Sequence, residues 1–177
     1  MGVPVATHEI YPAAFVGVDS TEHLGATSRR GYSPKQGPQG RYYSDVITLF
    51  GQSQRSITPT NFGALGGYVQ AHPVLARDPR LSLYPEWAQA SVTRSEFPPA
   101  VQALIASASI GNGDAIKRLY AAGARVVAGT DTPIAINLHA EIASYVDARL
   151  TPFQALQTAT KTPAEILGLD AGVIAKG

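Results

Sequence analysis

The sequence predicts an α/β protein, and more specifically half of a TIM-type (β/α) barrel with about four parallel strands and flanking helices. Short apolar runs that suit buried strands alternate four times with segments in which apolar residues have helical spacing. This alternation is typical of right-handed βαβ units around a parallel sheet. The length of 177 residues fits one domain. We therefore expect residues 1–177 to form a single truncated barrel domain, with a loop-rich insertion or lid at about 61–99.

Each expected element has a local signal in the sequence. The expected strands cover residues 3–7, 17–22, 56–60 and 124–128. The expected helices cover 42–50, 99–122, 138–149, 151–160 and 162–167, with a further short helix at 62–71. The helix from 99 is expected to break or kink around 111–113, to resume at Asp114 as an N-cap, and to end at Gly123. The polar, glycine-rich residues 25–41 predict a long loop.

Composition and charge exclude several classes of function. The net charge of +1, without any basic run, argues against a nucleic-acid or membrane-surface partner. Charged residues make up only 15% of the chain, which suits a protein that buries surface against a partner. The sequence has no cysteine, so thiolate catalysis and sulfur-bound zinc are excluded and any metal must be held by His and carboxylates. No signal peptide or membrane span is seen, so we expect a soluble protein and favour the cytoplasm.

Three of the expected strands are followed by a side chain that can bind a metal ion. His8 follows the first strand, His23 the second and Asp131 the fourth. In parallel α/β barrels the active site lies at the carboxyl ends of the strands, where such side chains converge. Two imidazoles and a carboxylate suit a divalent ion that activates water, so we predict a hydrolytic site that uses zinc or manganese. Each residue also has a structural interpretation: a histidine that is merely hydrogen-bonded, and an aspartate that caps a helix.

The runs that contain these residues resemble the amidohydrolase superfamily. Residues 2–8 (GVPVATH), 17–23 (GVDSTEH) and 122–133 (AGARVVAGTDTP) look like the fifth, sixth and eighth barrel strands of that superfamily. Residues 138–141 (LHAE) and 150–160 are similar to the helices after the last strand in its imidazolonepropionase-like and prolidase-like branch.

The resemblance implies roles for the three strand-end residues. His8 and His23 would be the histidine ligands of strands five and six, and Asp131 the carboxylate that binds metal and accepts a proton from the attacking water. The superfamily's paired histidines on the first strand, and the lysine often found on the fourth, have no counterpart in this chain. The tail at 168–177 resembles the start of the return to the family's small β-sandwich domain.

Other polar residues are candidates for binding substrate. A guanidinium fork suits a substrate carboxylate, and an imidazole can contact substrate or metal. Residues expected to bind substrate are Arg29, Arg30, Tyr32 and His139. His72 is expected to be structural, and Thr58 and Thr60 to line the pocket near the end of the third strand.

Three hypotheses for function follow. The first is a metal-dependent hydrolase that cleaves an amide, cyclic amide or ester bond with a metal-activated water, and so has carboxylesterase or amidase activity. The second is a metal-free promiscuous esterase that uses histidine general-base catalysis. The third is an inactive fragment that needs a partner half.

The half-barrel also carries an expectation about assembly. We expect a homo-oligomer, in which two half-barrels related by a twofold axis cover each other's sheet edges, because soluble proteins seldom leave such edges open. The alternative is that residues 61–99 fold back over the open side and permit a monomer.

Overall fold

Four parallel strands form a single sheet in the computed structural model, which describes residues 3–24, 41–61, 77–93, 98–131 and 135–176. The strands are β1 (Ala6–Thr7), β2 (Ser20–Glu22), β3 (Ser56–Thr58) and β4 (Arg125–Val126), and their order in the sheet is their order in the chain. Thr21 of β2 lies opposite Thr7 and Ile57, and Ile57 in turn lies opposite Val126. The predicted fold class, half of a parallel α/β barrel, is confirmed.

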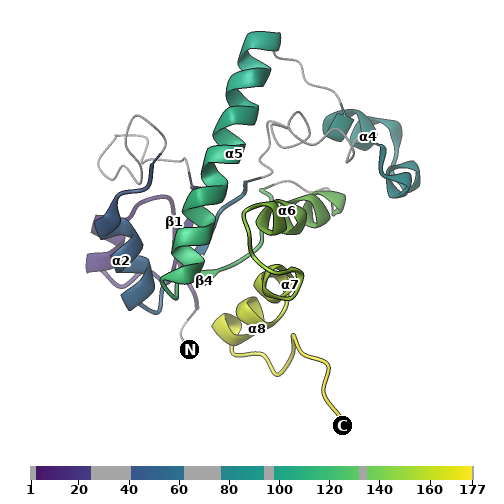
Figure 1. Cartoon of the computed structure of the whole chain (residues 1–177). Coiled ribbons are helices and arrows are strands. Elements are labelled where there is room, and N and C mark those ends of the chain that lie inside the picture. Colours follow the sequence, from purple (N-terminus) through teal and green to yellow (C-terminus); the bar gives the residue numbers. More distant parts are fainter. Residues whose placement is uncertain (1–2, 25–40, 62–76, 94–97, 132–134, 177) are drawn as a thin grey trace.

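Helices connect the strands and flank the sheet. The connections carry α1 (Tyr11–Phe15), then α2 (Ser44–Gln52), then the 3-10 helix η2 (Pro79–Leu83) with α4 (Glu86–Thr93) and α5 (Pro99–Ala121). After β4 come α6 (Ile136–Asp147), α7 (Pro152–Ala159) and α8 (Lys161–Leu167). In Figure 1, α5 runs between α2 on one side and α6 on the other, and it packs against both. None of the described helices is long and apolar enough to cross a membrane.

The core lies between the sheet and these helices. Ile57 and Val126 on the central strands are buried, as are Val46 and Phe50 on α2 and Ile116 and Leu119 on α5. On the other side of α5, Tyr145 of α6 is fully buried and its hydroxyl donates to the Val127 carbonyl at 3.3 Å. Burying each large apolar side chain contributes about 1.5–3 kcal/mol. This packing fixes the strands whose carboxyl ends carry the candidate site.

Two helix boundaries, the start of α7 and the end of α5, lie where the sequence indicates. Thr151 caps α7: its hydroxyl accepts the Gln154 N–H at 3.2 Å, and the Gln154 side chain accepts the Thr151 N–H at 2.9 Å. Gly123 follows α5 with φ +87°, the left-handed conformation that glycine adopts without strain. The predicted stop at Gly123 is confirmed.

Several predicted boundaries and one predicted break are wrong. The strand expected at 3–7 is shorter in the structure, where β1 covers only Ala6–Thr7, and Val3 and Val5 before it are exposed. The helix α5 is continuous from Pro99 to Ala121, so the break at 111–113 is absent. Packing of its second half against β4 and α2 outweighs the weak helix propensity of glycine, and Asp114 lies within the helix, 3.9 Å from Arg118.

The insertion at about 61–99 contains helix as well as loop. Of this segment the structure describes 77–93 and the start of α5, and 77–93 carry η2 and α4. Asp78 caps η2 by accepting the Arg80 N–H at 2.9 Å, and Glu86 lies in the first turn of α4. The helix expected at 62–71 and the loop at 25–40 lie outside the described residues.

Candidate active site

Three adjacent strands are followed by non-glycine residues with left-handed backbone conformation. His23 follows β2 with φ 60°, Thr60 follows β3 with φ 49°, and Asp131 follows β4 with φ 53°. This conformation is uncommon for residues other than glycine and is least favourable for β-branched threonine. Such strain costs about 1–3 kcal/mol per residue and persists where surrounding contacts hold it, often at functional sites. These three residues therefore mark the carboxyl edge of the sheet as the candidate site.

The imidazole of His23 lies between two polar side chains from the neighbouring strand ends. Its Nδ1 is 2.6 Å from Oγ1 of Thr60, a hydrogen bond, and its Nε2 is 3.8 Å from Oδ2 of Asp131. The His23 side chain is 23% exposed and that of Asp131 65% exposed, so solvent reaches both residues. The structure thus brings together two of the three predicted ligands.

The third predicted ligand, His8, lies against the face of His23. The two ring centroids are 4.8 Å apart and the ring planes differ by 27°, which is a stacked arrangement. Imidazole nitrogens bind metals in the plane of the ring, so stacked rings direct their lone pairs side by side. In this structure His8 is an exposed neighbour of the His23–Asp131 pair.

The arrangement fits part of a metal centre. Each ligand atom lies about 2.0–2.2 Å from a bound zinc ion, so two atoms that bind the same ion are no more than about 4.4 Å apart. The distance of 3.8 Å between His23 Nε2 and Asp131 Oδ2 is within this limit. Within the described residues no group of three metal-binding side chains surrounds one point. The pair therefore supplies two of the about four ligands that zinc usually takes.

Gly129 brings Asp131 close to the end of β3. A Cβ atom at Gly129 would lie 2.5 Å from the Cγ2 methyl of Thr58, too close for any side chain. The backbone after β4 is thus in contact with the Thr58 side chain, two residues before Asp131. Asp131 itself is not the N-cap of the following helix, because α6 begins at Ile136 with Ala135 as N-cap.

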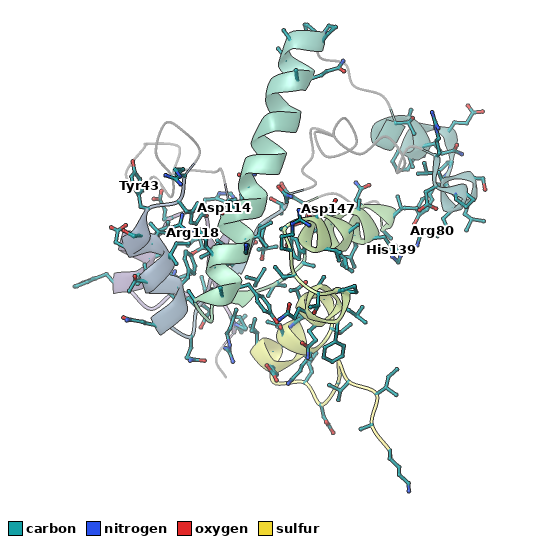
Figure 2. The ribbon with its side chains drawn as sticks, viewed as in Figure 1. Tyr43, Arg80, Asp114, Arg118, His139 and Asp147 are labelled. Carbon is teal, nitrogen blue, oxygen red and sulfur yellow. The ribbon has the colours of Figure 1, made fainter. Side chains whose placement is uncertain are left out.

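The structure places His139 in a different polar cluster. It lies in the first turns of α6, and Figure 2 shows it on the side of α6 that faces Arg80 of η2. Hydrogen bonds from the side chain and backbone of Arg80, with smaller electrostatic contributions from Arg80 and His139, lower the pKa of the Asp78 carboxyl to about 2. A role of His139 in binding substrate stays a prediction.

Some functional candidates lie outside the described residues, and others are new. Arg29, Arg30, Tyr32 and His72 belong to the first group, so their predicted roles stay predictions. Glu141 is new as a candidate: it is fully buried on α6, and its Oε1 accepts the Asn61 N–H at 2.8 Å, next to Thr60. The run LHAE contains Glu141, but nothing in its spacing distinguishes a buried carboxylate from a surface one.

A family model matches the part of the chain that carries Asp131. The family model described as the amidohydrolase family matches residues 102–177, which include β4, Asp131 and the helices after it. No curated protein matches the chain in a sequence search.

Solved structures share the fold over almost the whole chain. A Xaa-Pro dipeptidase crystallised with methionine in its active site superposes with a TM-score of 0.56 at 20% identity, covering 93% of this chain and 33% of its own. A bottromycin amidohydrolase superposes with a TM-score of 0.62 at 21% identity, covering 96% of this chain and 42% of its own. A further amidohydrolase gives 0.55 at 20% identity and covers 97% of this chain. The chain thus spans about a third to two fifths of the length of these relatives.

Proposed function

We propose, on the premise that the chain belongs to the amidohydrolase superfamily and shares the C-terminal part of its barrel, that it acts as a metal-dependent hydrolase of amide, cyclic amide or ester bonds. The observation that carries the proposal is the pair formed by His23 Nε2 and Asp131 Oδ2, 3.8 Å apart at the carboxyl edge of the sheet. Both atoms are electron-pair donors, and they lie where parallel barrels place their catalytic groups.

In this proposal His23 and Asp131 would hold one divalent ion, zinc or manganese, together with donors outside this pair. A divalent ion at such a site lowers the pKa of a water molecule and polarises the substrate carbonyl. His23 would bind the ion through Nε2, because its other ring nitrogen is hydrogen-bonded to Thr60. His8 stacks on the His23 ring and restricts its rotation.

Asp131 then carries the proton. As the water oxygen bonds to the carbonyl carbon, the Asp131 carboxylate accepts a water proton. It returns this proton to the leaving nitrogen or oxygen when the carbon–heteroatom bond breaks. The exposure of its side chain, 65%, leaves room for a substrate beside it. Xaa-Pro dipeptides are the first substrates to try, because a Xaa-Pro dipeptidase shares the fold, and activated esters are the easiest to cleave.

Binding of metal tests the proposal directly. We expect the protein, freed of metal by a chelator, to take up Zn²⁺ or Mn²⁺ in isothermal titration calorimetry, and to hydrolyse p-nitrophenyl acetate or an Xaa-Pro dipeptide faster once loaded. His23→Ala and Asp131→Ala should lose uptake, whereas His8→Ala should weaken it less. Asp170→Ala is the matched control, because Asp170 is an exposed carboxylate in the C-terminal tail. Equal uptake by wild type, His23→Ala and Asp131→Ala would overturn the proposal.

A second candidate function rests on the orientation of His23. His23 is held at Nδ1 by Thr60, and its Nε2 lies 3.8 Å from the Asp131 carboxylate. A histidine oriented between two polar groups in this way can act as a general base, which supports esterase activity without metal. Hydrolysis of p-nitrophenyl acetate that survives the chelator but is lost in His23→Ala would favour this candidate over the first.

A further inference from the structure

Hydrogen bonds to both of its peptide groups hold Thr60 in the left-handed conformation. The carbonyl of Pro59, in the peptide before Thr60, accepts the Leu24 N–H at 3.1 Å. The N–H of Asn61, in the peptide after Thr60, donates to Oε1 of Glu141 at 2.8 Å. The directions of these two peptide groups are set by φ and ψ of Thr60, because the peptide bonds themselves are planar. Partners for both groups therefore restrict Thr60 to its φ of 49°.

The two contacts come from different parts of the fold. Leu24 follows the neighbouring strand β2, so its bond belongs to the edge of the sheet. Glu141 lies on α6, 80 positions along the chain from Asn61. A β-branched residue rarely has a positive φ, and such a conformation persists only where the surrounding structure holds it. The bond from α6 is therefore the contact outside the sheet that maintains this conformation.

Glu141 is a fully buried carboxylate that the proposed chemistry does not use. It lies beside Tyr145, where burial, and to a smaller extent the nearby Glu141, raises the pKa of the phenol. Burying a carboxylate is costly unless hydrogen bonds compensate, and an apolar side chain of similar size would fill the same place at less cost. A carboxylate here therefore indicates a specific task, and its bond to Asn61 connects that task with the chain after β3.

The backbone of Thr60 determines where its hydroxyl lies. In the left-handed conformation Oγ1 is 2.6 Å from Nδ1 of His23, whichever of the two atoms donates. A change of φ and ψ alters the direction of the Cα–Cβ bond and moves Oγ1 with it. If Thr60 relaxed to the extended conformation that threonine prefers, its hydroxyl would leave the His23 ring.

We infer that Glu141 is a positioning residue. Through the Asn61 N–H it keeps Thr60 left-handed, and Thr60 thereby keeps the His23 ring beside Asp131. The conformation of Thr60 is a property of the fold alone, whereas any effect on hydrolysis rests on the proposed function. Groups that orient a metal ligand in this way typically matter by about 10–100-fold in metal affinity or activity.

The conformation of Thr60 can be measured by NMR in the full chain, without metal or substrate. A positive φ brings the N–H and Hα protons of one residue close together, so the nuclear Overhauser effect (NOE) between them is strong. In the chelator-treated wild type we expect this strong NOE at Thr60, and further NOEs between the Thr60 side chain and the His23 ring. We also expect slow hydrogen exchange at the Asn61 N–H, because its acceptor is buried. A weak intraresidue NOE at Thr60 in the wild type overturns the inference at once.

Variants of Glu141 test the cause. Glu141→Gln keeps an acceptor oxygen for the Asn61 N–H, whereas Glu141→Met fills a similar volume without one. We expect the wild-type NOEs in Glu141→Gln. In Glu141→Met we expect a weak intraresidue NOE at Thr60, loss of its NOEs to His23, and about tenfold or faster exchange of the Asn61 N–H.

A matched control and a milder variant separate this effect from misfolding. Tyr145→Phe removes the hydroxyl beside Glu141 but leaves the bond to Asn61, so the NOEs of Thr60 should stay unchanged. Circular dichroism shows whether each variant is folded. If Glu141→Met does not fold, Glu141→Asp, which withdraws the carboxylate by one methylene, should show the same losses. If neither folds, loss of the Thr60 NOE in Glu141→Gln still overturns the inference.

The outcomes distinguish the role of Glu141 from the proposed function. Unchanged NOEs at Thr60 in folded Glu141→Met overturn that role, whether or not the protein binds zinc. Lost NOEs in a protein that neither binds metal nor hydrolyses esters support it and count against the function. If both hold, Glu141→Met should lower kcat by about tenfold or more with little change in KM, and Glu141→Gln should stay close to wild type. An equal loss of kcat in both variants would show that Glu141 does not act through the Asn61 N–H.

Discussion

His23 and Asp131 face each other although their strands do not pair. β2 and β4 both pair with β3, and the His23 Nε2 and Asp131 Oδ2 atoms lie 3.8 Å apart at its carboxyl end. Both residues have positive φ, as does Thr60 after β3 itself. The candidate site therefore depends on three strand ends at once.

The first prediction concerns Asp131. Asp131→Asn should lower hydrolysis by at least about a hundredfold, the effect expected for losing a group that transfers a proton. Stability should hardly change, because the side chain is 65% exposed and asparagine tolerates the left-handed backbone as well as aspartate does. Steady-state rates with a thermal melt check both parts, and Asp170→Asn is the control. A variant with the wild-type rate would show that Asp131 takes no part in the reaction.

A second prediction concerns the contact between Gly129 and Thr58. Gly129→Ala should destabilise the protein by about 1–3 kcal/mol and reduce hydrolysis, because the new Cβ would lie 2.5 Å from the Thr58 methyl. Adding Thr58→Ser removes that methyl and should restore most of the loss. Urea unfolding of the two single variants and the double variant measures the coupling. Additive effects would mean that the methyl is not the obstacle.

The third prediction concerns pH and the Asp78–Arg80 pair. Hydrogen bonds from Arg80 lower the pKa of Asp78 to about 2, below the about 3.9 of an unfolded chain. A lowered pKa stabilises the fold above pH 3.9, and this contribution disappears as the pH falls through about 2. Carboxyl ¹³C NMR should show the Asp78 midpoint near 2. In Arg80→Met the midpoint should rise toward about 3.9, and an unchanged midpoint would contradict the assignment to Arg80.

A fourth prediction concerns the edge of the sheet. Val3 and Val5, which precede β1, are 77% and 53% exposed, and Phe15 at the end of α1 is 93% exposed. The described part of the expected lid, η2 and α4, lies across α5 from β1 in Figure 1. Exposed apolar side chains at a sheet edge favour association with another chain. The 177-residue chain should therefore form a homodimer with twice the single-chain mass of 18.6 kDa.

Light scattering after size-exclusion chromatography measures that mass. Val3→Lys with Val5→Lys should shift the protein to monomer, whereas Ile174→Lys should not, since Ile174 is a fully exposed apolar residue in the C-terminal tail. A wild-type mass near 18.6 kDa at micromolar concentration would rule out the dimer.

The order of elements could be predicted from the sequence because apolar runs and punctuating residues are local signals. Gly123 illustrates this, since its place after a helical run indicated the helix end that φ +87° confirms. The break at 111–113 illustrates the opposite case. Glycine weakens a helix locally, but packing of the second half of α5 against β4 and α2 decided the outcome.

The candidate site could be predicted only in part, because some of its contacts depend on packing between segments that are distant in the sequence. His8, His23 and Asp131 follow apolar runs, so their common edge could be inferred, but the stacking of His8 on His23 depends on side-chain packing in three dimensions. The contribution of Thr60 depends on a left-handed φ that nothing in its neighbours demands. Glu141 has the appearance of a solvent-facing residue in a helix, and only the packing of α6 buries it.

The agreement between strand order and chain order bears on how the molecule folds. Because β1, β2, β3 and β4 are neighbours in sequence as in space, each strand can join a growing sheet at its open edge, without being inserted between strands already paired. β3 can provide Thr60 for His23 as soon as the third strand docks, but Asp131 arrives only with the fourth. The pair of donors at the sheet edge is therefore complete only when both β2 and β4 have docked on β3.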